Sequence, residues 1–144
     1  MSVSTSHVPE AVRERVRTWS RERCCYCRAP RRLVLGQLEV EHIHPHSLGG
    51  TSDELNLCLA CRLCNGFKSN QTVGHDPVSG EAVALFHPRR QMWDDHFAWS
   101  DNGLRILGRS PCGRATVVAL RLNNDHAIEV RTEWAKVGLV PFTE

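Results

Sequence analysis

Two pairs of cysteines constrain the folding of this 144-residue chain more than any other feature. Cys24 and Cys27 form one CxxC sequence, and Cys61 and Cys64 form the second. A CxxC turn brings two sulfurs close enough to share one tetrahedral Zn²⁺ at about 2.3 Å. Because two such turns fill all four positions of the metal, the sequence predicts a structural zinc site.

Disulfide bonds or buried free thiols are the alternatives for these cysteines. The chain has seven cysteines, an odd number, and its first residues, MSVSTSHVPE, contain no apolar stretch that could serve as a secretory signal. We therefore expect a cytoplasmic protein, in which paired cysteines bind metal more often than they form disulfides. Because Cys25 adjoins Cys24, a shift of the ligand by one residue stays open. No role is assigned to Cys25, Cys58 and Cys112.

The segment that joins the two cysteine pairs favours strands. In residues 38–43, Leu38, Val40 and His42 alternate with Glu39, Glu41 and Ile43, which predicts a strand that Pro45 ends. Residues 47–52 are typical of a loop, residues 55–60 predict a second short strand, and residues 62–70 predict a helix. The predicted order is therefore strand, loop, strand, helix.

The sequence on either side of this segment adds further elements. Pro9 opens a predicted helix whose apolar stripe is formed by Val8, Val12, Val16 and Trp19. Beyond it we expect a strand at 81–86, a hairpin at 97–107, and helices at 110–123 and 126–137. We expect residues 1–144 to form a single domain with a core at 24–70 and a C-terminal extension at 81–144, and a small separate lobe is the alternative.

Charge is distributed unevenly along the chain. Residues 1–32 hold eight arginines against three glutamates, whereas residues 33–64 hold one arginine against four acidic residues. A basic end beside an acidic centre suits a protein that grips phosphates with one part and holds a cation with another. Arg13 and Arg17 are the candidate nucleic-acid contacts, although these arginines could equally serve to solvate a helix. No apolar run approaches the ~20 residues that cross a bilayer, so no membrane partner is expected.

Three stretches together resemble the HNH (His-Me finger) endonuclease family. They are CCYC at 24–27, VEHIHPHSLGG at 40–50 and LNLCLACRLCNGFKS at 55–69. The resemblance covers about a third of the chain. It implies an α+β fold with a ββα-metal core stapled by the structural zinc, an N-terminal helix and a C-terminal α/β extension.

The same resemblance implies a role for each matching residue. His42 corresponds to the general base that takes a proton from the attacking water, and Asn56 corresponds to the residue that braces the loop beside it. Glu41 and Asn65 correspond to the ligands of a catalytic divalent ion. Lys68 corresponds to a basic residue near the scissile phosphate.

The chemistry of these residues agrees with the implied roles. Carboxylate and amide oxygens suit Mg²⁺ or Mn²⁺, and an imidazole with a pKa near ~6.5 is a competent base at neutral pH. A zinc ligand or a buried strand histidine are the alternatives for His42. We expect a metal-dependent endonuclease that acts on DNA with Zn²⁺ and Mg²⁺ or Mn²⁺ and without an organic cofactor.

Two other classes of protein remain as alternatives. A zinc-stapled nucleic-acid-binding module without catalysis would need the fold and the basic helix, but it would need neither the acid–histidine pair nor Asn65. A zinc-dependent protein-interaction domain would leave the acidic ligands and the arginines unexplained. The target sequence, the oligomeric state and the biological role do not follow from the sequence.

Overall fold

The computed structural model describes residues 7–142, and the chain within it divides into two compact units. The first unit extends to Thr72 and also takes in His87–Arg90, and the second contains Val73–Phe86 and the chain from Gln91 onward. The single domain expected over 1–144 stays a prediction. None of the helices in the described part of the chain is both long enough and apolar enough to cross a membrane.

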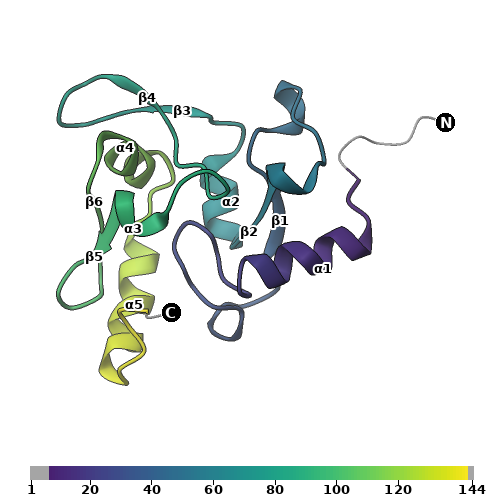
Figure 1. Ribbon diagram of the computed structural model, residues 1–144. Coiled ribbons are helices and arrows are strands. Elements are labelled where there is room, and N and C mark those ends of the chain that lie inside the picture. Colours follow the sequence, from purple (N-terminus) through teal and green to yellow (C-terminus); the bar gives the residue numbers. More distant parts are fainter. Residues whose placement is uncertain (1–6, 143–144) are drawn as a thin grey trace. The chain divides into compact units, whose positions relative to one another are not determined.

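The first unit contains the predicted strand, loop, strand and helix. A long loop joins two antiparallel strands, and α2 follows the second strand after a single residue (Figure 1). Short 3-10 turns occur at Arg31–Leu33, His46–Leu48 and Glu54–Asn56. The four main elements are α1 (Glu10–Trp19), β1 (Glu39–His42), β2 (Leu57–Ala60) and α2 (Arg62–Lys68).

The core of this unit lies between α1 and the β1–β2 hairpin. Val8 and Val16 are buried against Leu57 and Leu59 of β2, and three partly buried residues complete the cluster: Val12, Leu38 and Val40. The predicted valine stripe is confirmed, and it is this stripe that holds α1 on the hairpin. Trp19, in contrast, is 42% exposed.

The register of the hairpin places alternate residues of β1 on opposite faces. Glu39 pairs with Ala60 and His42 pairs with Leu57, and successive side chains point to opposite sides of a strand. Val40 therefore belongs to the core beneath α1, whereas Glu41 points to the face on which α2 packs. Because both faces of the hairpin are covered, all four residues of β2 are buried.

Up to residue 142, the second unit consists of two short hairpins and three helices. Strand β3 (Val73–His75) pairs with β4 (Ala82–Ala84), and β5 (Phe97–Trp99) pairs with β6 (Ile106–Gly108). The expected C-terminal strand, hairpin and two helices are present. The helices are α3 (Trp93–His96), α4 (Pro111–Ala119) and α5 (Asp125–Lys136).

Strand β3 was not predicted, because its sequence resembles a break after α2. Val73–His75 is a short run followed at once by the turn Asp76–Gly80, and such a run carries too little periodicity to predict a strand. It becomes a strand only by pairing with β4. Asp76 also accepts two hydrogen bonds of 2.8 Å from the Arg114 guanidinium, which ties this turn to α4.

Candidate functional site

The four predicted cysteine ligands converge on one point of the first unit. Cys24 and Cys27 lie in the turn after α1, Cys61 is the N-cap of α2, and Cys64 lies in its first turn. All four sulfurs lie within 4.8 Å of one another, and Cys27 Sγ is 3.7 Å from Cys61 Sγ. A tetrahedral Zn²⁺ with bonds of about 2.3 Å places its sulfurs about 3.8 Å apart. The spacing of the sulfurs therefore fits zinc.

Backbone geometry and charge also suit a cation at this cluster. The Cys27 amide points at Cys24 Sγ and the Cys64 amide at Cys61 Sγ, each at 3.5 Å, as is typical of metal-binding turns. Hydrogen bonds from the neighbouring thiols lower the pKa of Cys61 and raise the pKa of both Cys27 and Cys64. A thiolate thus forms readily at Cys61, and its charge disfavours ionisation of the neighbouring thiols. A divalent cation would relieve that repulsion.

The cluster contains Cys24, as predicted, and not its neighbour Cys25. Cys25 lies outside the cluster, because its thiol points at Ser20 Oγ, 3.5 Å away, and its backbone amide donates to the Leu59 carbonyl at 2.9 Å. Cys58 is also buried and lies 3.4 Å from Glu41 Oε2. These two thiols pack as small core residues.

His42 is the last residue of β1, and its ring is partly buried. Its Nε2 lies 3.0 Å from Ser52 Oγ, and the ring of His46 lies 6.4 Å away, centroid to centroid. Burial lowers the pKa of His42, and the positive charges of His46 and Arg13 lower it further. The imidazole is therefore neutral at neutral pH, which is the form that accepts a proton.

Asn56 ties down the loop that joins β1 to β2. Its Oδ1 accepts from the His44 amide at 2.8 Å, and its Nδ2 donates to the carbonyls of His44 at 3.0 Å and Thr51 at 2.7 Å. Gly50 lies so close to this bridge that a Cβ there would come within 1.8 Å of the His44 carbonyl oxygen. The loop is thus drawn tight next to Ser52, the residue that contacts His42.

Glu41 and Lys68 form an ion pair in the interior. The Lys68 ammonium lies 2.8 Å from Glu41 Oε1 and donates to the Ile43 carbonyl at 2.9 Å, and the two side chains are 4% or less exposed. The Tyr26 hydroxyl donates to Glu41 Oε2 at 2.7 Å. Burial raises the pKa of Glu41, and the charge of Lys68 opposes that shift. This pair joins β1 to α2.

Each of the two oxygen ligands expected for a catalytic cation contacts another side chain in this arrangement. The Asn65 amide group donates to Glu39 Oε1 at 2.9 Å, while the Glu41 carboxylate holds the Lys68 ammonium. Carboxylate and amide oxygens suit a hard divalent ion by chemistry, but Glu41 would have to release Lys68 to bind one. The ligand roles of Glu41 and Asn65, and the phosphate contact of Lys68, stay predictions.

Residues 24–71 match the family model of the HNH endonucleases. These residues are an HNH endonuclease domain. The match contains both cysteine pairs, the β1–β2 hairpin and α2, whereas α1 lies outside it. Comparison with curated proteins and with solved structures gave no match. Membership of the HNH domain in a nuclease family supports nucleic-acid binding and a divalent catalytic metal in this protein.

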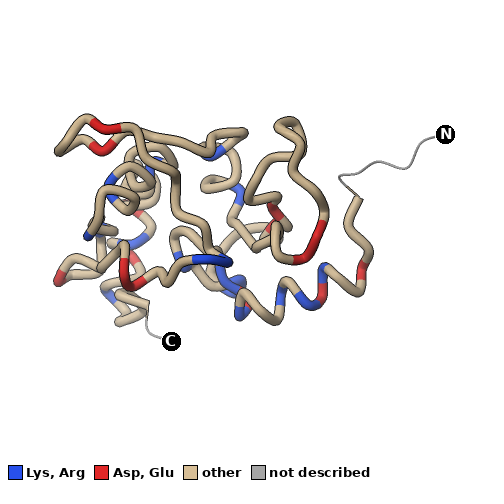
Figure 2. Tube along the Cα trace, turned by 45° about the horizontal axis from the view of Figure 1, so that its top comes forward, with Lys and Arg blue, Asp and Glu red and all other residues tan. Residues whose placement is uncertain are grey.

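Basic residues recur along α1, next to the HNH domain (Figure 2). Arg13 Nε donates to the Val8 carbonyl at 3.1 Å, and the charge of Arg13 acts on His42. Arg17 forms an ion pair with Glu10. Exposed ion pairs of this kind contribute only about 0–1 kcal/mol, so a phosphate can compete for Arg17 at little cost.

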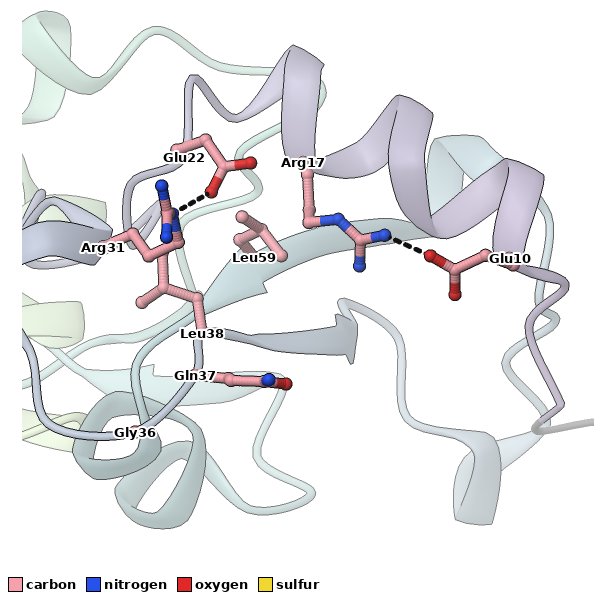
Figure 3. A pocket seen from close by; sticks show the side chains of 8 residues that line it. All are labelled: Glu10, Arg17, Glu22, Arg31, Gly36, Gln37, Leu38 and Leu59. Atoms are coloured by element: carbon pink, nitrogen blue, oxygen red, sulfur yellow. Dashed lines mark hydrogen bonds and ion pairs between the residues drawn. The ribbon is translucent and has the colours of Figure 1, made fainter.

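A pocket of about 550 Å³ lies beside α1, away from His42. Figure 3 shows its two arginines turned toward glutamates, Arg17 toward Glu10 and Arg31 toward Glu22, the latter at 2.8 Å. None of the proposed catalytic residues lines it.

Three residues of the site gave no signal in the sequence. Ser52 lies in a loop and Tyr26 lies inside the first CxxC sequence, and each contacts its partner only because β1 and its loop are folded against it. His46 belongs to a short 3-10 turn that returns it toward His42. Contacts of this kind leave no periodic pattern that sequence reasoning could detect.

Zinc should be bound at one ion per chain, and Cys61→Ser should remove both the metal and most of the stability. Structural zinc contributes roughly 10–16 kcal/mol in small domains, compared with a total stability of about 5–15 kcal/mol. Elemental analysis and thermal unfolding measure the two effects. Cys112→Ser, outside the cluster, is the matched control and should keep the zinc. Folded protein that lacks zinc would contradict the assignment.

Lys68→Met should destabilise the protein by about 3–5 kcal/mol, because it leaves the buried Glu41 carboxylate without its partner. The midpoint of denaturant unfolding measures this loss. Lys136→Met is the control, since Lys136 is exposed and pairs with the exposed Glu133. A Lys68→Met protein that is as stable as the wild type but binds DNA poorly would instead support the phosphate contact.

Proposed function

We propose that this protein is an endonuclease that hydrolyses phosphodiester bonds in DNA with His42 as the general base. The observation that carries the proposal is the setting of His42 within an HNH domain. Its ring is partly buried at the end of β1, its pKa is lowered, and the Asn56-braced loop holds Ser52 against it. These are the conditions for a neutral, oriented imidazole beside the surface.

In the proposed reaction His42 takes a proton from water as the water oxygen attacks phosphorus. The bond from phosphorus to the leaving deoxyribose oxygen then breaks, and that oxygen takes a proton from solvent water, while His42 later releases its own proton to solvent. Ser52 limits rotation of the His42 ring, because its Oγ lies 3.0 Å from Nε2. A general base of this type contributes about 10²–10⁴-fold to the rate.

We further propose that cleavage depends on Mg²⁺ or Mn²⁺. Such an ion, when bound, neutralises phosphate charge and stabilises the leaving oxygen. For Glu41 to act as its ligand, the Lys68 ammonium would have to leave the carboxylate. Asn65, whose amide nitrogen contacts Glu39, is the second proposed ligand.

DNA binding is proposed to use Arg13 and Arg17 on α1. Both project from the helix that packs on the hairpin carrying His42, and the charge of Arg13 already acts on His42. A positive charge that lowers the pKa of an imidazole also attracts a phosphate to the same place. The positive charge on α1 therefore helps to keep His42 neutral and also attracts the DNA substrate.

The ion pair of Glu41 with Lys68 favours one second candidate, a zinc-stapled nucleic-acid-binding module without catalysis. In that case the pair is permanent and no cation is bound at Glu41. Against this candidate stands His42, since a purely structural histidine needs neither partial exposure nor a lowered pKa. Cleavage assays separate the two functions.

The wild-type protein should nick supercoiled plasmid in the presence of Mg²⁺ or Mn²⁺, and His42→Ala should reduce that rate by about 10²–10⁴-fold. The variant should keep its zinc, its fold and its affinity for DNA. His126→Ala, which removes an exposed histidine of α5, should cleave at the wild-type rate. Wild-type protein that binds DNA but never cleaves it would favour the non-catalytic module.

The cleavage rate should rise with pH through the titration of His42. Only the neutral imidazole accepts a proton, so the rate is lost as pH falls through its pKa. Burial and two positive neighbours lower that pKa, and we expect the midpoint below the usual value of about 6.5. Arg13→Ala, which removes one of those charges, should move the midpoint upward. A rate independent of pH between 5 and 8 would speak against His42 as the base.

A further inference from the structure

The segment His87–Arg90 lies with the HNH domain although it follows the β3–β4 hairpin in the sequence. Arg89 anchors it. The Arg89 Nε donates to the Leu57 carbonyl at 2.9 Å, and the guanidinium carbon lies 3.6 Å from the centroid of the Trp19 ring. A guanidinium stacked on an indole is a favourable contact, so β2 and α1 together hold this segment in place.

The anchored segment lines a pocket with the loop that Asn56 braces. The pocket has a volume of about 480 Å³, and its wall includes His44, Thr51, Asn56, His87 and Arg90. Thr51 and Asn56 belong to the tightened loop, and His87 and Arg90 come from the anchored segment. The walls of the pocket thus come from two parts of the chain that are distant in sequence.

The pocket presents donors and a positive charge. Arg90 is exposed, and its guanidinium has no ion-pair partner among residues 7–142. His87 Nδ1 accepts from the Arg89 amide at 3.3 Å, which places the proton of the neutral ring on Nε2. Asp53 is the acidic residue of the wall, and its Oδ1 accepts from the Leu55 amide at 2.9 Å, so that oxygen is already used.

The pocket lies next to the proposed general base. Thr51 lines it, and the following residue, Ser52, contacts His42. Consecutive Cα atoms are about 3.8 Å apart, and each strand of duplex DNA carries a phosphate about every 3.4 Å along its axis. A strand with one phosphate at His42 therefore brings a neighbouring phosphate toward this pocket.

We propose that Arg90 binds a backbone phosphate of the DNA strand in this pocket, next to the phosphate that is cleaved. Guanidinium groups bind phosphate oxygens through two parallel N–H bonds, and His87 lines the same pocket. Arg89 acts as a positioning residue, because it holds the segment that carries Arg90. The proposal rests on the proposed function, since it takes DNA as the substrate.

The test is the salt dependence of binding to a 20-base-pair duplex, measured by fluorescence anisotropy. All proteins carry His42→Ala so that the duplex stays intact. Adding Arg90→Ala should weaken binding to all sequences alike and reduce the slope of log K against log salt by about 0.9, the value for one phosphate contact. Arg105→Ala is the matched control, because Arg105 is exposed and lies in the second unit outside the pocket.

The possible results separate the proposed phosphate site from the proposed endonuclease function. A reduced slope for Arg90→Ala with an unchanged slope for Arg105→Ala supports the phosphate site. If the wild type cleaves DNA but Arg90→Ala and Arg105→Ala both keep the salt slope of the His42→Ala parent, the phosphate site is overturned and the proposed function stands. A wild-type protein that neither binds nor cleaves DNA would overturn both. Circular dichroism of each variant shows that a changed slope does not arise from unfolding.

Discussion

Four cysteine sulfurs gather the turn after α1, the end of β2 and the first turn of α2 around a single point. Each of these segments is short, and β1 and β2 have only four residues each, too few to be stable as an isolated hairpin. A cation shared by the sulfurs would link the hairpin to the helix that covers one of its faces. The positions of His42 and Asn56 follow from that link, because both residues lie at the ends of these strands.

The two faces of the hairpin are stabilised by different interactions. Beneath α1 the contacts are apolar, between Val16 of the helix and Leu57 and Leu59 of β2. Toward α2 the contact is the buried pair of Glu41 with Lys68. A buried ion pair adds less stability than apolar packing, but it tolerates no loss of one partner. The pair therefore specifies how β1 packs against α2. Lys68 also fixes the backbone just after His42 through its hydrogen bond to the Ile43 carbonyl.

Much of this arrangement could be predicted from local sequence. Paired CxxC turns, the valine stripe of α1 and the alternation in residues 38–43 each reflect a spacing along the chain, and the corresponding elements are present. The direction in which Glu41 points also follows from that alternation. The partner of Glu41 does not follow from it, because a lysine at position 68 is equally compatible with an exposed side chain and with a buried ion pair. Strand β3 likewise depends on a partner strand.

The sequence by itself determined the four clustered cysteines, the order of the core elements and the identity of the candidate base, because each depends on residue type and local spacing. Tertiary structure alone decided which charges are buried, which loop contacts His42, and that His87–Arg90 returns to the HNH domain. Those features arise from packing between segments that are distant along the chain, such as the contact of Arg89 with Trp19. The free energy of such a contact depends on both partners and on the backbone between them, and no pattern within either segment records it.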